Sequence, residues 1–266
     1  MDFSLFDTHC HLASERYAID LPEVIRSCRE AGVRALAAGV DVASSRLNLE
    51  LAASHDGVLA AVGVHPTGVL ELDEEGWREI SRLAASPLAV AVGETGLDYY
   101  WKDVPPAAQA KWFDRHIELA LALGKPLLLH ARESIPDVVS RLEPHFTSGL
   151  KVLWHCFSAG KKEMASALEF ALAHGVGLAL GGLVTFEDQK TLRRHVPLIP
   201  DDLLFLETDA PYLSPRPKLS DRNEPARIVR VAEVVAELRG RSPEDIARLT
   251  SRNAERLFGL PETKAE

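Results

Sequence analysis

Six residues with metal-binding side chains each lie within a residue or two of the end of a short apolar run. They are His9, His11, Glu94, His130, His155 and Asp209. Imidazole nitrogens and carboxylate oxygens bind divalent ions, and such ions support hydrolysis by an activated water. Because the six residues come from distant parts of the chain, the fold would have to assemble this metal site.

The first apolar run ends on a His-x-His pattern. Alternate side chains of an extended strand point to the same face, so His9 and His11 share a face while Cys10 points away from it. Two imidazoles on one face can bind one ion. Cys10 and Cys156 each lie beside one of the six residues, and we expect both to pack in the structure rather than to bind metal.

Apolar runs and amphipathic stretches alternate along the whole chain. The apolar runs predict eight strands, at Phe3–Thr8, Arg34–Val40, Val58–Val64, Leu88–Gly93, Pro126–His130, Lys151–His155, Val176–Gly181 and Leu203–Thr208. Apolar residues spaced three and four apart predict helices at Pro22–Ala31, Ala43–Ser54, Glu74–Ala84, Pro106–Leu123, Ile135–Leu142, Lys161–His174 and Asp188–His195. Two further helices are expected at Ala226–Arg239 and Ser242–Phe258, after a proline-containing loop at Ser214–Pro225.

Alternating strands and helices, with strands that are nearly continuously apolar, are typical of a parallel sheet covered by helices. Eight repeats in 266 residues fit an α/β fold of the (β/α)8 TIM barrel type, which typically needs about 250 residues. An open doubly wound sheet is the alternative, and it usually carries a glycine-rich turn after the first strand, which this sequence lacks. We therefore expect one domain over residues 1–266, folded as a TIM barrel.

A TIM barrel would bring the six residues together. Active sites of such barrels lie at the carboxyl ends of the strands. The six residues end the first, fourth, fifth, sixth and eighth predicted strands. All six are therefore expected at one mouth of the barrel.

The composition narrows the possible functions. A formal net charge of −9 argues against a protein that coats nucleic acid by bulk electrostatics, because such domains are usually basic. The net charge does not argue against an enzyme that binds the end of a nucleic-acid strand at a metal site. Three cysteines at unrelated spacings make no disulfide framework, and we find neither a secretory leader nor a spanning apolar stretch. We expect a cytoplasmic enzyme without a membrane or an obligate protein partner.

The donor set also restricts the metal and the reaction. Four imidazoles with two carboxylates suit Zn, Mn, Co or Fe better than Mg, which prefers oxygen ligands. Six ligands exceed the three protein ligands of a typical catalytic zinc site, which favours two ions bridged by a carboxylate. Two ions ~3.5–4 Å apart can activate water and stabilise the leaving oxygen of a phosphodiester. Hydrolysis is the expected reaction, since the sequence shows no P-loop, dinucleotide fingerprint or Gly-x-Ser-x-Gly elbow.

Six short strings of the sequence carry a family resemblance. They are Phe6-Asp7-Thr8-His9-Cys10-His11-Leu12, Gly63-Val64-His65-Pro66, Gly93-Glu94-Thr95-Gly96-Leu97-Asp98-Tyr99-Tyr100, His155-Cys156-Phe157-Ser158, Glu207-Thr208-Asp209-Ala210-Pro211-Tyr212-Leu213 and Arg222-Asn223-Glu224-Pro225. In this order, over nearly the whole chain, they resemble the TatD family of metal-dependent deoxyribonucleases. The resemblance implies a TIM barrel that removes nucleotides from the 3′ ends of DNA strands, with RNA as a possible second substrate.

The same resemblance implies how two divalent metal ions are held. His9, His11 and Asp209 would bind one ion. His130 and His155 would bind the other, and Glu94 would bridge the two. Mg or Mn is implied as the ion of the active enzyme, and the imidazole-rich donor set leaves Zn open as a bound ion.

Two residues are candidates for a direct part in the reaction. His65 follows the third predicted strand and faces the same mouth, so it could contact the scissile phosphate or the leaving oxygen. Asp209 could accept the proton of the attacking water as well as bind metal.

Four further residues are candidates for binding the substrate. Arg132 and Arg222 could pair with phosphate oxygens through two hydrogen bonds each, or they could form structural ion pairs. Tyr99 and Tyr100, with Trp101 after them, follow the fourth predicted strand. Their rings could stack on bases, or they could pack within their loop.

Two alternative functions stay open. The chain could be another metal-dependent hydrolase of the same superfamily, such as an aminoacyl-tRNA deacylase, a small phosphodiesterase or an amidohydrolase. Amidohydrolases often carry a carboxylated lysine at the fourth strand, where this sequence has Glu94, and this difference favours phosphoester hydrolysis. A non-catalytic metal-binding barrel is the second alternative.

Overall fold

Eight parallel strands form one sheet in the computed structural model, which describes residues 4–217 and 222–261. Each strand pairs with the next along the chain: β1 (Leu5–Cys10), β2 (Val33–Ala37), β3 (Val58–Val62), β4 (Ala89–Asp98), β5 (Leu127–Arg132), β6 (Val152–Trp154), β7 (Gly177–Leu180) and β8 (Leu204–Leu206). A parallel bridge between Cys10 and Ala210 links the ends of β1 and β8. The sheet is a nearly closed barrel, and the expected TIM barrel is confirmed.

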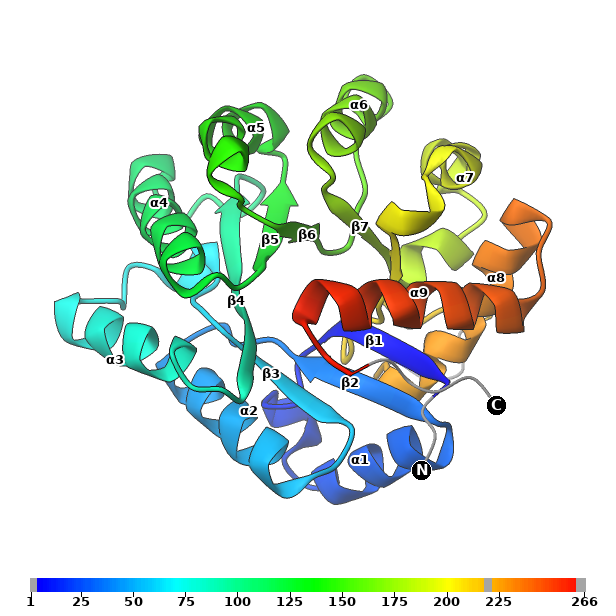
Figure 1. The fold of residues 1–266 in the computed structure, drawn as a ribbon, viewed down its shortest axis with the longest axis horizontal. Coiled ribbons are helices and arrows are strands. Elements are labelled where there is room, and N and C mark those ends of the chain that lie inside the picture. The colour runs from blue at the N-terminus through cyan, green and yellow to red at the C-terminus, as the bar shows by residue number, and fades with distance from the viewer. Residues whose placement is uncertain (1–3, 218–221, 262–266) are drawn as a thin grey trace.

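Helices connect the strands and surround the barrel (Figure 1). They are α1 (Leu21–Glu30), α2 (Val42–Ser54), α3 (Glu74–Ala84), α4 (Pro106–Leu123), α5 (Ile135–Leu142), α6 (Met164–His174), α7 (Lys190–His195), α8 (Ile228–Arg239) and α9 (Pro243–Phe258). Polar side chains cap several of them, because the first N–H groups of a helix have no partner within it. The Asp41 side chain accepts from the N–H of Ser44 at α2, and Ser242 accepts from Asp245 at α9.

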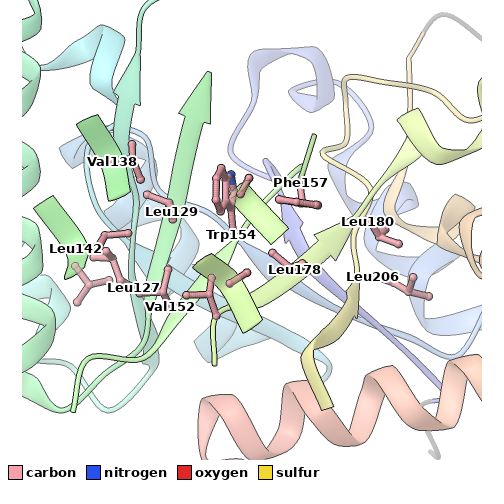
Figure 2. Close-up of a cluster of buried hydrophobic side chains, with 14 of the residues drawn as sticks. Leu127, Leu129, Val138, Leu142, Val152, Trp154, Phe157, Leu178, Leu180 and Leu206 are labelled. Carbon is pink, nitrogen blue, oxygen red and sulfur yellow. The ribbon is translucent and has the colours of Figure 1, made fainter. Parts of the chain in front are cut away.

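Alternate strand residues divide the core into two layers. In β5, Leu127 and Leu129 face the helices and belong to the same cluster as Val138 and Leu142 of α5 (Figure 2). Leu128, between them, belongs to the barrel interior. The interior also holds residues from the other strands and their ends, namely Phe6, Leu36, Ala38, Ala61, Ala91, Leu153, Ala179 and Phe205. The barrel is therefore a packed core and not a channel.

Helix α9 covers the amino-terminal end of the barrel. Phe258 of α9 stacks on Phe6 of β1, with ring centroids 5.7 Å apart. Asn253 donates to the backbone oxygens of Asp201 and Leu204, at the start of β8. The six predicted ligands lie at the opposite, carboxyl-terminal end of the barrel, in the ends of the strands and in the loops that follow them.

Strand β4 differs most from its prediction. The apolar run predicts Leu88–Gly93, but the strand continues to Asp98. Its pairing with β5 shifts register between Val92 and Thr95 and then resumes, so that Asp98 lies opposite Arg132. Backbone pairing holds this polar, glycine-containing extension in the sheet, and an apolar pattern carries no signal for it.

Smaller differences concern the ends of other elements. Strand β1 runs later than predicted, and Phe3 lies outside the described residues, as do residues 218–221 of the predicted loop Ser214–Pro225. A 3-10 turn at Pro225–Arg227 ends that loop, so α8 begins two residues later than the predicted helix Ala226–Arg239. Within residues 4–217 and 222–261, no helix is both long enough and apolar enough to cross a membrane.

Helix α4 carries a fully buried histidine, His116, which binds the backbone after β3. Its Nε2 accepts the N–H of Val64 (3.2 Å), so the ring proton lies on Nδ1 and donates to the carbonyl oxygen of Trp112 (2.7 Å). Both bonds require the neutral ring, because a protonated Nε2 would meet another N–H. Burial lowers the pKa of His116 to about 4.

We expect His116 to make the fold sensitive to acid. Its pKa falls from 6.5 to about 4 on folding, so the unfolded chain takes up the proton first and stability falls as the pH drops from 6.5 toward 4. The His116→Gln variant keeps a donor and an acceptor but does not titrate. The free energy of unfolding is measured with urea, in the presence of chelator, at pH 7.5 and at pH 4.5. Between these two pH values it should fall by about 2–3 kcal/mol more in the wild type than in the variant. Equal losses would contradict this role.

Candidate metal centre

The barrel places all six predicted ligands around one point at its carboxyl-terminal end. Three of them lie in strands, His9 in β1, Glu94 in β4 and His130 in β5. The other three lie in the loops that follow β1, β6 and β8. All are largely buried, and the most exposed of them, Asp209, has 14% of its side chain accessible.

The two carboxylate oxygens of Glu94 face two different pairs of imidazole nitrogens. Oε2 lies 3.2 Å from Nε2 of His9 and 3.7 Å from Nε2 of His11. Oε1 lies 2.8 Å from Nδ1 of His130 and 3.0 Å from Nε2 of His155. Glu94 therefore stands between two sets of histidines.

Asp209 completes the first set. Its Oδ1 lies 3.2 Å from Nε2 of His11 and 3.9 Å from Nε2 of His9. The two nitrogens of this set are 3.3 Å apart, and those of His130 and His155 in the second set are 3.0 Å apart. Atoms that bind one ion at about 2.0–2.2 Å lie roughly 3 Å from each other, so this spacing suits a shared cation.

The chemistry of these donors also fits divalent cations. Within each set two imidazole nitrogens face each other, and in a neutral pair at most one of the facing atoms carries a proton. Among the described residues, Oε2 of Glu94 is buried without a hydrogen-bond partner. A cation would satisfy these lone pairs together. Three groups of described residues could hold an ion: His9 with His11 and Asp209, His9 with Glu94 and His155, and His65 with Asp98 and His130.

Burial and the imidazoles act in opposite directions on the two carboxylates. Burial alone would raise the pKa of Glu94, but His155 and His9, with smaller effects from two further histidines, hold its pKa well below the usual range. Burial also raises the pKa of Asp209, and the hydrogen bond and charge of His11 bring it below the usual value. Both groups are therefore ionised at neutral pH, as carboxylate ligands must be.

Contacts between the ends of β1 and β8 set the distance between His9 and Asp209. The buried carboxylate of Asp7 accepts the N–H groups of Thr208 (2.9 Å) and His9 (3.2 Å). The N–H of Asp209 then donates to the carbonyl oxygen of His9 at 3.0 Å. Two predicted ligands that are 200 positions apart in the chain are thus joined by hydrogen bonds of their own backbone and of Asp7.

His65 lies beside the second set, three residues after β3. Its Nε2 is 3.6 Å from Oε1 of Glu94, and its ring stands edge-on to that of His130 at 4.4 Å. Nδ1 accepts the backbone N–H of Thr67 (3.2 Å), so the neutral ring carries its proton on Nε2. Burial and the neighbouring His130 lower the pKa of His65 to about 3. It therefore presents a neutral N–H donor toward the centre.

Arg132 and Tyr100 lie together at the rim of the barrel mouth. The Arg132 guanidinium lies over the Tyr100 ring, 3.8 Å from its centroid, and Trp101 meets that ring edge-on at 5.0 Å. Tyr100 is 45% exposed and Trp101 is 51% exposed. These two rings and the guanidinium form a solvent-facing patch beside the end of β4, which we call the rim patch.

The other two predicted substrate contacts have partners within the protein. The Tyr99 hydroxyl donates to Asp137 of α5 at 2.6 Å. The Arg222 guanidinium donates to both carboxylate oxygens of Asp20, at 2.7 and 2.6 Å, and to Glu224 at 3.2 Å. For Arg222 this is the structural ion pairing that the sequence left open as an alternative.

Two buried carboxylates next to the centre have no role in the sequence interpretation. Oδ2 of Asp98 lies 2.9 Å from Nε2 of His130. Glu207 accepts the N–H of Cys156 (2.7 Å) and lies 3.7 Å from Nδ1 of His155. Burial raises the pKa of Glu207 to about 7, against the opposing effect of His155.

A signal for both carboxylates exists in the sequence. Asp98 is four residues after Glu94, and Glu207 is two residues before Asp209. Even spacing in an extended chain puts two side chains on the same face. This spacing would place Glu207 beside Asp209, but it would place Asp98 beside Glu94 only if the strand continues past its apolar run.

Comparisons with known proteins point to one family. A sequence profile of the family described as "TatD related DNase" matches residues 6–259. The chain is 38% identical to the "uncharacterized metal-dependent hydrolase YabD" of Bacillus subtilis, over 96% of this chain and 99% of that one. It is 37% identical to the "3′-5′ ssDNA/RNA exonuclease TatD" of Erwinia amylovora, over 96% and 100% of the two chains. Among solved structures, the TatD homolog YJJV of Escherichia coli K12 superposes with a TM-score of 0.90 at 26% identity, covering 98% of this chain and 100% of that one.

Proposed function

The chain belongs to the TatD family and is a metal-dependent hydrolase, and on this basis we propose that it removes nucleotides from the free 3′ ends of single-stranded DNA. The observation that carries the proposal is Glu94, whose two oxygens face two sets of imidazole nitrogens. Two ions bridged by one carboxylate suit phosphodiester hydrolysis, because the attacking and leaving oxygens both need stabilisation. The relative from Erwinia amylovora, named a 3′-5′ ssDNA/RNA exonuclease, supports this substrate class and makes RNA a second candidate.

We assign the ligands of the two ions by the side of Glu94 that they face. His9, His11 and Asp209 would hold one ion together with Oε2 of Glu94. His130 and His155 would hold the other together with Oε1. Mg or Mn is the proposed ion of the active enzyme, and Zn also suits the imidazole-rich set. When bound, the ions would stabilise negative charge on the phosphate and lower the pKa of water.

Asp209 and His65 are the proposed catalytic groups. Asp209 is ionised and is the most exposed of the six ligands, so it can accept a proton from the attacking water. The Nε2–H of His65 can donate to a phosphate or leaving oxygen beside Oε1 of Glu94. Because its pKa is low, His65 acts here as a neutral hydrogen-bond donor and not as an imidazolium.

We propose the rim patch as the surface that receives unpaired bases. A base stacked on an aromatic ring such as Tyr100 contributes about 1–3 kcal/mol to binding, with little sequence preference. Arg132 is exposed next to that ring and can reach a phosphate with two donors. Tyr99 and Arg222 would have to give up hydrogen bonds to Asp137 and Asp20 to bind substrate, so we assign them weaker contacts.

The substrate is tested with 5′-labelled strands. In Mg or Mn, a linear single strand should be shortened stepwise, while a circular strand of the same sequence and a 3′-phosphorylated strand should resist. Chelator should stop the reaction, and a linear RNA strand measures the breadth of the substrate. Glu94→Gln protein prepared in parallel controls for contaminating nuclease. Equal cleavage of circular and linear strands would refute the exonuclease proposal.

A further inference from the structure

Asp98 of β4 is 1% exposed and is not one of the six proposed ligands, yet it contacts one of them. We propose that Asp98 is a positioning residue: it fixes which nitrogen His130 presents to the metal centre, and it anchors the rim patch to the same point. The inference rests on the proposed ligand role of His130. It does not depend on which nucleic acid is the substrate.

The imidazole of His130 lies between two carboxylates. Oε1 of Glu94 is 2.8 Å from Nδ1, on the side of the metal centre. Oδ2 of Asp98 is 2.9 Å from Nε2, on the other side of the ring. A neutral imidazole has one N–H, so the carboxylate that binds this proton leaves the opposite nitrogen with a free lone pair.

We place this proton on the Asp98 side, because Oε1 of Glu94 also faces Nε2 of His155, at 3.0 Å. Oδ1 accepts the backbone N–H groups of Tyr100 (3.0 Å) and Trp101 (3.3 Å). Oδ2 is turned to Nε2 of His130 and accepts its N–H. With the proton held there, Nδ1 keeps its lone pair for a cation, in the same way that carboxylates orient metal-binding histidines in general.

The backbone holds Asp98 in this position. Its N–H donates to the side chain of Gln109 (2.7 Å), whose amide group donates back to the Asp98 carbonyl oxygen (2.8 Å). Gln109 is itself 1% exposed. Nearby, Gly96 pairs with His130 so closely that a Cβ atom on Gly96 would lie 1.9 Å from the His130 carbonyl oxygen. Only a glycine there lets β4 run close enough to β5 for this arrangement.

The same carboxylate anchors the rim patch. The two N–H groups that Asp98 binds belong to Tyr100 and Trp101, whose rings are about half exposed. One buried side chain therefore joins the proposed stacking surface to a proposed metal ligand. Loss of the Asp98 charge should therefore disturb both the rim patch and the orientation of His130.

His65, Asp98 and His130 also form a group whose atoms could hold an ion of its own. In that arrangement, His130 would have to bind one cation through Nδ1 and another through Nε2, which requires the imidazolate anion. The neutral ring with Nε2–H bound to Asp98 needs no such deprotonation. We therefore assign Asp98 to positioning His130 and not to a further metal site.

Two substitutions separate positioning from a purely structural role. In Asp98→Asn, the amide oxygen must face the two backbone N–H groups, so the NH2 group faces Nε2 of His130 and forces the ring proton onto Nδ1. Asp98→Ala removes the carboxylate without forcing the proton there. The Asn variant is closer in shape to the wild type, yet its metal affinity should fall about 10–100-fold below that of the wild type. The Ala variant should lose less metal affinity than the Asn variant.

Metal affinity is measured on the apoprotein by competition of Mn²⁺ with a chelator, and nitrogen NMR at pH 9 reports which nitrogen of His130 carries the proton. Circular dichroism checks that each variant is folded. Asp137→Asn is the matched control, because Asp137 is an exposed carboxylate of the same region that binds the Tyr99 hydroxyl. It should bind Mn²⁺ like the wild type.

A larger loss of affinity in Asp98→Asn than in Asp98→Ala, with the proton moved to Nδ1, is the expected result. Unchanged affinity in Asp98→Asn, or a larger loss in Asp98→Ala, would overturn the proposal. None of these measurements uses a nucleic acid. The positioning of His130 can therefore be supported even if the nuclease assay is negative, and it can be refuted even if that assay is positive.

Discussion

The Glu94→Gln variant should hydrolyse its substrate at least about 10³-fold more slowly and bind fewer metal ions per chain than the wild type. Glutamine has nearly the same shape, but it is uncharged and has one oxygen, so it cannot bind cations on both sides. In this fold Oε2 faces His9 and Oε1 faces His130. Ions contribute several kcal/mol of charge stabilisation in such reactions, and about 4 kcal/mol corresponds to about 10³ in rate.

Elemental analysis gives the metal content, and a single-turnover assay gives the rate. Glu94→Ala should behave like Glu94→Gln if the missing carboxylate is the cause. Glu74→Gln is the matched control, because Glu74 is an exposed carboxylate that pairs with Arg115 (2.7 Å) on the surface. A fully active Glu94→Ala enzyme with unchanged metal content would refute the proposal that Glu94 bridges two ions.

The His65→Ala variant should lose about 10²–10³-fold in kcat, as enzymes do when one hydrogen-bond donor to a developing negative charge is removed. Its metal content and KM should change little, because Nε2 of His65 lies beside Glu94 at 3.6 Å while the proposed ligands stay in place. Steady-state kinetics on a labelled strand, with elemental analysis of the same preparation, separates these quantities.

Two variants calibrate the His65 result. Thr67→Val removes the hydroxyl that contacts Nδ1 at 2.7 Å but keeps the backbone N–H, so the loss in kcat should be smaller. His55→Ala changes a histidine at the end of α2 and should leave kcat unchanged. An unchanged kcat in His65→Ala would remove this residue from the reaction, and a loss of bound metal would make it a ligand.

The barrel and the grouping of ligands could be predicted because both follow from periodicity. Alternating apolar runs and amphipathic stretches specify parallel strands, and parallel strands of a barrel end on the same side. Residues such as His9, Glu94 and Asp209, each at the end of an apolar run, must then meet. No knowledge of side-chain packing is needed for this step.

Side-chain partners far apart in the chain could not be predicted in the same way. Arg222 follows the last strand, as an exposed phosphate-binding residue would, but its guanidinium binds Asp20, which is 202 positions away. Which of two possible anions an arginine binds depends on where loops from opposite ends of the chain come together. Periodicity carries no information about that.

Asp98 shows a second limit. Its position four residues after Glu94 puts it on the same face only if the strand continues beyond the apolar run, and the Thr95-Gly96 segment gives no sign that it does. The register shift near Val92 and the close approach at Gly96 are properties of the paired strands β4 and β5. The hydrogen bond from His130 to Asp98 depends on how these two strands pair, and the sequence pattern does not specify that pairing.

Anomalous X-ray scattering from crystals soaked in Mn²⁺ tests the bridging role of Glu94 most directly. We predict two peaks about 3.5–4 Å apart, one on each side of the Glu94 carboxylate. One peak should lie among His9, His11 and Asp209, and the other beside His130 and His155. A single peak, or two peaks that do not share Glu94, would contradict a hydrolase built on a carboxylate-bridged pair of ions.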